Sequence, residues 1–273
     1  MKVHLITEST GVYNNYLPFL VKTIDIFYPG VEKTFNLISD KEYRIDIQEH
    51  KDYIMSNYYH ICNLPYPYIT FFKTQYICDL IKQFGYSDED YFLFCDADSH
   101  FLEMPNGFYD NLFNDDKLHY AISPWIWGGG WDIAHDENIP NAGKSITYIE
   151  GLNKFNFPNY CQASLFFCKI GVFKTINKVF MNYVADDATR DVIPFMNDQS
   201  FFNKYIHDNP DNVVAGNYIC NSYSYNGEDD DYYACGADCY PPDSVKDEIF
   251  CVQKFRQDIK KDKRNSNKFD DEI

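Results

Sequence analysis

The chain has 273 residues and a mass of 32.2 kDa, enough for one large domain or two small ones with a sizeable core. Hydrophobic residues make up 45% of it and charged residues 24%, which excludes a disordered, collagen-like or coiled-coil chain. The 41 acidic residues outnumber the 24 basic ones and give a formal net charge of −17. We expect no nucleic-acid partner, because binding a phosphate backbone relies on clustered Lys and Arg.

The sequence predicts neither a membrane segment nor export. It contains no run of about 18 apolar residues, and the start MKVHLITEST lacks a basic segment followed by an apolar one. There is no N-x-Ser/Thr sequon, and most of the 9 cysteines lie in apolar stretches, where a thiol acts as a small hydrophobic group. We therefore expect a soluble protein in a reducing, cytoplasmic compartment.

Short apolar runs alternate with helical patterns along the chain. In chain order, the pattern predicts a strand at 3–6, a helix at 15–27, strands at 34–38 and 59–64, a helix at 70–84, strands at 91–95, 118–122 and 163–168, helices at 172–183 and 198–207, and a strand at 213–218. Thr70 is the expected N-cap of the second helix, and Gly85 lies just past its end. Alternation of strands and helices with fully apolar strands predicts an α/β protein with a mostly parallel sheet.

The last 28 residues differ in composition from the rest. We expect residues 1–245 to form a single domain and residues 246–273 to form a polar tail, either a surface arm or a disordered one. The tail carries the basic cluster of the chain: Lys254, Arg256, Lys260, Lys261, Lys263 and Arg264.

The strongest chemical signal follows the predicted strand at 91–95. Asp96 and Asp98 come directly after this apolar run, where the carboxyl end of a parallel strand meets a ligand crevice. Two carboxylates at that place predict a hard-cation site for Mn²⁺ or Mg²⁺ with open positions for substrate phosphates. The alternative is a strand-end turn in which the aspartates only cap the backbone.

The Asp-Ala-Asp arrangement resembles the D-x-D motif of nucleotide-sugar glycosyltransferases with the GT-A fold. More of the chain, from about residue 3 to 225, is similar to glycosyltransferase family 6, which includes the blood-group A/B transferases and α-1,3-galactosyltransferase. Four further segments carry the similarity: Glu8-Ser-Thr-Gly-Val-Tyr13, the helix around Lys73, Tyr160-Cys-Gln162-Ala-Ser-Leu-Phe166, and Asn197-Asp198-Gln199-Ser-Phe-Phe-Asn203-Lys-Tyr205.

The resemblance implies a GT-A fold and a metal-dependent hexosyltransferase that uses a UDP-sugar. It places the donor nucleotide at Thr7, Ser9, Tyr13, Lys73 and Asp96, and the metal at Asp96 and Asp98. It assigns Asp198 and Gln199 to catalysis and Gln162 to the acceptor, and it implies transfer with retention of configuration. In the family a basic C-terminal tail folds over the nucleotide, so the tail here is expected to form a water-excluding lid.

Three positions depart from the family pattern. Gln199 stands where the family has a Glu, and Asn197 and Gln162 stand where it has His. Because Gln cannot form a glycosyl ester, a double displacement through position 199 is disfavoured. A front-face route, in which the acceptor hydroxyl attacks beside the departing diphosphate, needs Gln199 only to orient groups by hydrogen bonds.

Trp125 and Trp127 lie in a segment with three consecutive glycines, residues 128–130. Aromatic rings pack against the C–H faces of sugars, and the glycines argue against a regular element. We therefore expect an acceptor-binding loop, the alternative being a packed aromatic cluster.

The function predicted from the sequence is transfer of a hexose or N-acetylhexosamine from a UDP-sugar to a hydroxyl group of a glycan or other acceptor. Two alternatives stay open: a transferase of another GT-A family, such as the glycogenin-like group, and a catalytically inactive relative that binds a nucleotide or sugar. A nucleotidyltransferase would also use carboxylates and Mg²⁺, but its usual glycine-rich basic loop is not evident at residues 7–13.

Overall fold

The computed structural model describes residues 1–42, 54–65, 68–122, 144–149, 159–194, 197–222 and 243–254. Its strands are β1 (Val3–Ser9), β2 (Lys33–Ser39), β3 (Ile54–His60), β4 (Tyr91–Cys95), β5 (Ser99–Phe101), β6 (Leu118–Ile122), β7 (Cys161–Lys169), β8 (Val213–Gly216), β9 (Ile219–Ser222) and β10 (Cys251–Lys254). Its α-helices are α1 (Leu17–Lys22), α2 (Tyr68–Phe71), α3 (Lys73–Phe84), α4 (Ile170–Thr189) and α5 (Asp198–Asp208).

The central sheet has seven strands in the order β3-β2-β1-β4-β7-β6-β8. The first four strands in this order are parallel to one another, and β6 is parallel to β8. Between these groups, β7 is antiparallel to both β4 and β6. All strands but β7 thus run the same way. This confirms the predicted α/β class with a mostly parallel sheet, and it is compatible with a Rossmann-like fold.

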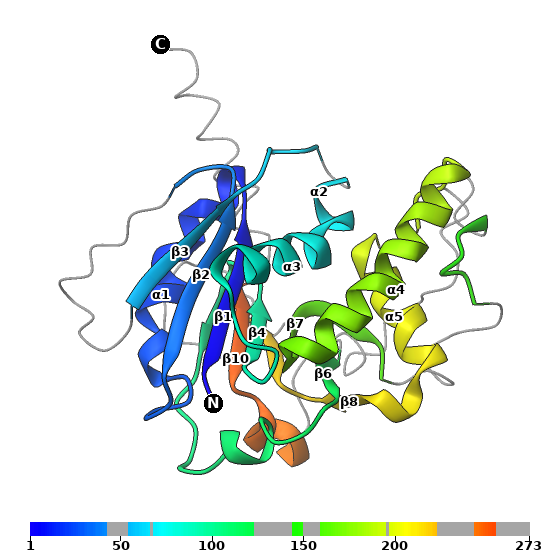
Figure 1. Ribbon diagram of the computed structural model, residues 1–273. Helices are drawn as coiled ribbons and strands as arrows, with labels where there is room; N and C mark the ends of the chain where they lie inside the picture. The colour runs from blue at the N-terminus through cyan, green and yellow to red at the C-terminus, as the bar shows by residue number, and fades with distance from the viewer. Residues whose placement is uncertain are drawn as a thin grey trace.

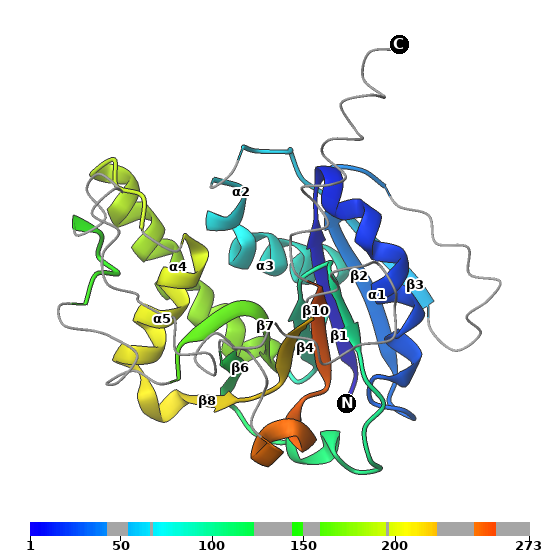
Figure 2. The ribbon, with the colours of Figure 1, turned by 180° about the vertical axis from the view of Figure 1, so that it is seen from behind.

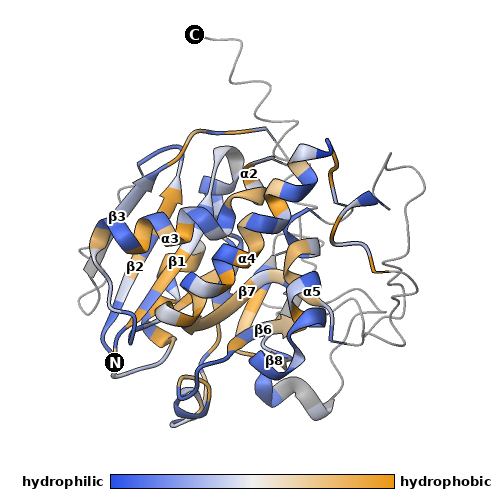
Figure 3. Ribbon diagram, turned by 45° about the vertical axis from the view of Figure 1, so that its right-hand side comes forward, coloured by the Kyte–Doolittle hydropathy of each residue, from blue (hydrophilic) through white to orange (hydrophobic). Residues whose placement is uncertain are grey.

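Each face of the sheet carries its own core, because successive side chains of a strand point to opposite faces. Val3 and Leu5 of β1 cluster with Leu17 of α1, whereas Ile6 clusters with residues of α3, α4 and α5. Figure 1 shows α3 and α4 in front of the sheet, and Figure 2, from behind, shows α1 and β10 in front. In Figure 3 both α3 and α4 carry hydrophobic and hydrophilic stretches in turn, as expected for helices with one buried side.

The first predicted helix is shorter than expected. In place of one helix over 15–27, the α-helix α1 spans only Leu17–Lys22, between 3-10 turns at Gly11–Tyr16 and Ile24–Ile26. Pro18 favours the first helical turn because it has no N–H to donate. At the other end, the Thr23 hydroxyl donates to the Leu20 carbonyl at 2.9 Å and competes with the helical pattern.

The second predicted helix ends as expected but begins differently. Thr70 lies inside the short helix α2, so its predicted N-cap role is wrong, and α3 begins at Lys73 after Phe72. Gly85 follows α3 in the left-handed conformation, with φ of 68°, and its N–H bonds to the Ile81 carbonyl. This confirms the predicted stop, which requires a residue tolerant of positive φ.

A second sheet of three strands, in the order β5-β10-β9, was not predicted. Residues 249–252, at the start of the predicted tail, are at most 2% exposed, and β10 lies between β5 and β9. The expectation of a surface arm or disorder is therefore wrong for this stretch. In the sequence its short apolar run is flanked by charged residues, so it gives no clear strand signal. Residues 255–273 lie outside the described part of the chain, so the lid stays a prediction.

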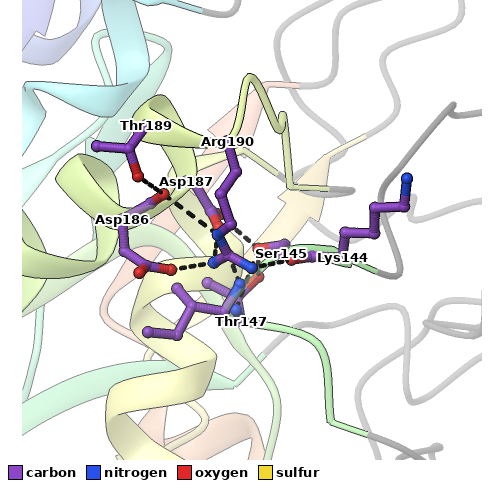
Figure 4. A network of polar contacts seen from close by, with 8 residues as sticks. Lys144, Ser145, Thr147, Asp186, Asp187, Thr189 and Arg190 are labelled. Carbon is purple, nitrogen blue, oxygen red and sulfur yellow. Dashed lines mark hydrogen bonds and ion pairs between the residues drawn. The ribbon is translucent and has the colours of Figure 1, made fainter.

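A polar network near the end of α4 holds the segment 144–149 (Figure 4). Asp187 is 2% exposed and accepts hydrogen bonds from Ser145 Oγ at 2.6 Å and from the Ile146 N–H at 2.9 Å. Arg190 Nη2 lies 3.1 Å from Asp187 Oδ1, and Arg190 Nη1 donates to the Lys144 carbonyl at 2.5 Å. The buried carboxylate is thus fully engaged and anchors this segment to the helix.

Candidate functional site

The carboxyl ends of β1 and β4 lie side by side where the connections of the sheet change faces. β1 is followed by α1 on one face, whereas α3 precedes β4 on the other face. In open α/β sheets such a point leaves a crevice in which ligands bind. Ile6 of β1 pairs with Phe94 of β4, and two residues further along come Glu8 and Asp96. The candidate site is therefore built around these two ends.

Asp96 and Asp98 follow β4 and are brought together by Gln253 of β10. Gln253 Nε2 donates to Asp96 Oδ2 at 3.1 Å and to Asp98 Oδ1 at 3.2 Å. The Asp96 N–H also donates to the Ser164 carbonyl of β7 at 2.9 Å, which fixes the start of this turn. Asp98 is 6% exposed, whereas the Asp96 side chain is 31% exposed. Two carboxylates thus converge, and one of them is open to a ligand.

Lys73, the first residue of α3, lies beside Asp96 and Asp198. Lys73 Nζ lies 2.7 Å from Asp198 Oδ2 and 3.8 Å from Asp96 Oδ1, and it donates to the Ala163 carbonyl at 3.4 Å. Burial lowers the pKa of Lys73, but the carboxylates of Asp198, Asp96 and Glu8 more than offset this and raise the pKa above its ordinary value. The side chain therefore provides a fixed positive charge at the site.

Glu8 of β1 also lies at the site, although no role is predicted for it from the sequence. Burial raises its pKa to about 8, with the neighbouring charges of Asp198 and Asp96 acting in the same direction and Lys73 acting against them. Its Oε2 atom makes no hydrogen bond to any other described residue. At neutral pH the carboxyl group therefore keeps its proton, and it can donate a hydrogen bond to an anionic ligand oxygen.

Asp198 is positioned by the way α5 attaches to β7. The side chain of Asn203 accepts from the Cys161 N–H at 2.8 Å and donates to the Cys161 carbonyl at 3.0 Å. Directly before the helix, Asn197 has a positive φ of 52°. Strained conformations of this kind persist where the surroundings enforce them, and they are frequent at functional sites.

Gln162 and Ala163 form the β7 side of the site. Gln162 Nε2 donates to Gln253 Oε1 at 2.5 Å, so the predicted acceptor residue contacts the amide that joins the two aspartates. Ala163 is buried and has a positive φ of 58°, which is unfavourable for a residue with a Cβ. This backbone turns its carbonyl to Lys73, so the strain is coupled to the position of the lysine.

The predicted nucleotide residues of β1 lie on the opposite face from Glu8. Thr7 and Ser9 are at most 1% exposed, and neither hydroxyl makes a hydrogen bond to another described residue. Strand alternation places both on the α1 side, whereas Lys73 approaches from α3. Tyr13 lies in the 3-10 turn Gly11–Tyr16 and is partly buried.

The remaining predicted residues fall into two groups. Gln199 lies in the first turn of α5 and makes a side-chain hydrogen bond with the buried Tyr160. Trp125 and Trp127 lie outside the described part of the chain, so their acceptor role stays a prediction. The structure therefore brings together Asp96, Asp98, Lys73, Asp198 and Gln162, and it adds Glu8 and Gln253.

The donor set fits Mn²⁺ or Mg²⁺. The described residues contain no group of three or more His, Cys, Asp or Glu arranged to hold a metal. Asp96 and Asp98 nevertheless offer carboxylate oxygens, Gln253 carries an amide oxygen beside them, and the nearby Gln162 Oε1 is buried without a hydrogen bond to other described residues. Oxygen ligands in this small number suit an ion that keeps waters or substrate oxygens.

No protein-family model matches this chain, and no curated protein matches it. The resemblance to glycosyltransferase family 6 therefore rests on the motifs quoted above. Within the described part of the chain, no helix is long and apolar enough to cross a membrane.

Proposed function

We propose that this protein is a metal-dependent glycosyltransferase of the GT-A fold, which moves a hexose or N-acetylhexosamine from a UDP-sugar to a hydroxyl acceptor. One observation carries the proposal. Asp96 and Asp98 converge at the switch point of the sheet, beside the buried Lys73 and the carboxylate of Asp198. A site with two carboxylates for a cation and a fixed positive charge suits a diphosphate. A diphosphate leaves the sugar as an anion, and the negative charge that develops on it must be stabilised.

The roles of the side chains follow from their positions. Asp96 and Asp98 would hold Mn²⁺ or Mg²⁺, which when bound neutralises the diphosphate of the donor. Lys73 places a second positive charge next to Asp96, and the protonated Glu8 can donate a hydrogen bond to a phosphate oxygen. Asp198, held by Lys73, is the carboxylate available to stabilise positive charge on the donor sugar.

The configuration of the product is expected to be retained through a front-face reaction. Gln199 cannot act as a nucleophile in such a transfer, and its hydrogen bond to Tyr160 gives it an orienting role. The acceptor hydroxyl would then lose its proton to the departing diphosphate. The anomer formed in the first minutes of turnover, read by proton NMR, distinguishes retention from inversion.

The first test is thermal melting with UDP and a panel of UDP-sugars, each with Mn²⁺, Mg²⁺ or EDTA. A ligand at 100 times its Kd stabilises the native state by about 2.7 kcal/mol, which corresponds to a rise in Tm of about 5–10 °C. We expect a rise that requires both nucleotide and metal, and the largest rise identifies the donor. Absence of a rise with every uridine nucleotide would contradict the proposal.

Variants at the two aspartates test whether the rise in Tm depends on these side chains. Asp96→Asn and Asp98→Asn should each remove the metal-dependent rise, because a neutral amide binds a divalent cation weakly. Asp211→Asn, at an exposed aspartate of the turn Pro210–Asn212, is the matched control and should keep it. Transfer to water gives the final readout: free sugar released from the UDP-sugar indicates an enzyme, whereas UDP binding without release indicates the inactive relative.

A further inference from the structure

The amide of Gln253 occupies the position between the two aspartates where a cation would bind. Gln253 Nε2 donates to Asp96 Oδ2 at 3.1 Å and to Asp98 Oδ1 at 3.2 Å, so one nitrogen bridges the two carboxylates. Since an amide nitrogen carries two hydrogens, each carboxylate receives one of them. Gln253 is 9% exposed, so these contacts are made in a largely buried setting, where they are strong.

A cation between the aspartates is incompatible with this orientation of the amide. The two N–H groups carry partial positive charge and point at the site that the ion would fill. A half-turn of the amide exchanges Nε2 and Oε1, which have nearly the same size. It therefore replaces two repelled donors by an oxygen ligand of the kind that Mn²⁺ and Mg²⁺ prefer.

Gln162 can follow this half-turn. At present Gln162 Nε2 donates to Gln253 Oε1 at 2.5 Å, while Gln162 Oε1 is buried without a hydrogen bond to other described residues. After a half-turn of Gln253, its Nε2 faces Gln162. A matching half-turn of Gln162 presents Oε1 as the acceptor. The contact between the two amides is thus kept with its polarity reversed, and Nε2 of Gln162 takes the place of the Oε1 atom that has no hydrogen bond to other described residues.

We propose that Gln253 is the third protein ligand of the cation held by Asp96 and Asp98, and that its amide turns together with that of Gln162 when the ion binds. Occupancy of the metal site is thereby coupled to the orientation of Gln162 on β7. This inference rests on the metal site of the proposed function and adds a ligand from β10.

The test measures Mn²⁺ affinity from the loss of the free-ion EPR signal, without and with UDP. Gln253→Met removes the oxygen and should weaken binding at least about tenfold. Gln253→Glu keeps an oxygen and lacks the N–H groups, so it should bind Mn²⁺ at least as tightly as the wild type. Gln83→Met, at an exposed glutamine of α3, is the control and should change nothing. Circular dichroism of each apo variant checks that it is folded.

Two results overturn the assignment. If Gln253→Met binds Mn²⁺ as tightly as the wild type, Gln253 only bridges the two aspartates and is not a ligand. If Gln253→Glu binds Mn²⁺ as weakly as Gln253→Met, the affinity for the ion depends on the N–H groups of Gln253 and not on its oxygen. Either result leaves the proposed function standing. A wild-type chain that takes up no Mn²⁺, with or without UDP, contradicts both proposals.

A measurement on the wild-type protein tests the coupled turn without relying on the folding of a variant. In a titration with diamagnetic Mg²⁺, the side-chain NH₂ signals of Gln253 and Gln162 should shift together in ¹⁵N–¹H spectra and saturate at the same Mg²⁺ concentration. Unchanged signals at saturating Mg²⁺ would overturn the coupled turn.

Discussion

Lys73 Nζ and Asp198 Oδ2 lie 2.7 Å apart, and the pair joins the start of α3 to the start of α5 across the candidate site. Both side chains are largely buried, with 10% and 16% of their surface exposed. The lysine also faces Asp96 at 3.8 Å, so it is the cation within a group of carboxylates. The pair therefore links α3 and α5, which pack on the same face of the sheet, at the candidate site.

Lys73→Met is expected to destabilise the protein by about 3 kcal/mol, because it leaves Asp198 and Asp96 close together without a compensating charge. Urea unfolding with a constant m-value measures the loss. The double variant Lys73→Met/Asp198→Leu removes both charges and should recover part of the stability. If the proposed function holds, UDP-sugar turnover should be lost in both variants. Equal stability of the single and double variants would contradict this account.

Asp187→Ala is expected to cost about 3 kcal/mol, since the buried carboxylate satisfies a hydroxyl, a backbone N–H and a guanidinium group. The Ile146 amide should exchange with deuterium faster, because Asp187 Oδ1 is its acceptor. Asp186→Ala is the matched control: Asp186 pairs with the same Arg190 from an exposed position, and its loss should cost less than about 1 kcal/mol. Similar losses in both variants would refute the anchoring role.

Stability should fall as the pH decreases below about 6.5, in part because of His4. Burial lowers the pKa of His4 in the folded state, and Asp90 offsets this only in part. Below its unfolded-state pKa of about 6.5, the unfolded chain binds a proton that the folded chain does not, so the free energy of unfolding decreases.

His4→Gln should flatten the dependence of unfolding free energy on pH between about pH 7 and 5.5. His119→Gln should act in the same direction, since burial lowers the pKa of His119 as well. Urea titrations at several pH values test this. Stability curves that run parallel for wild type and both variants would exclude a contribution of these histidines.

Gly216→Ala should destabilise the protein by about 2–3 kcal/mol through overpacking. A Cβ at this position would come within 2.1 Å of the Tyr218 ring, which is packed against Phe167 and Phe250. Gly171→Ala is a milder comparison, with a nearest contact of 3.2 Å to the Asp88 Cβ. Thermal melting ranks the two variants, and an equal or smaller effect at Gly216 would show that the Tyr218 ring moves aside.

The strands of the central sheet could be read from the sequence where they are uninterrupted and apolar. The strands at 91–95 and 118–122 were predicted with their observed bounds, and the strand after residue 212 was predicted two residues too long. Continuous burial leaves one plain signal, an apolar run between polar residues. The strand predicted at 59–64 is in fact Ile54–His60, because polar residues interrupt its pattern.

The second sheet could not be predicted, because its strands have only three or four residues. Runs that short carry no detectable periodicity. Gln253 was missed for the same reason: its relation to Asp96 exists only once β10 lies between β5 and β9.

Within the site, the sequence located the two aspartates at the end of a buried strand, and the structure places them there. It also placed Lys73 and Asp198 in the same site through the resemblance. The unusual protonation of Glu8 depends on burial and on neighbours from α3 and α5, which no local pattern records. Metal binding at Asp96 and Asp98 stays a prediction.

The place of Gln253 in the chain has a consequence for how the protein folds. It is separated from Asp96 by 157 residues and from Asp98 by 155. Contacts at such separation form late, since closing a long loop costs entropy before the contact is made. A refolding chain should therefore regain helical signal first and cation affinity last. Binding of Mn²⁺, followed in time, would then report the docking of β10 instead of the formation of the central sheet.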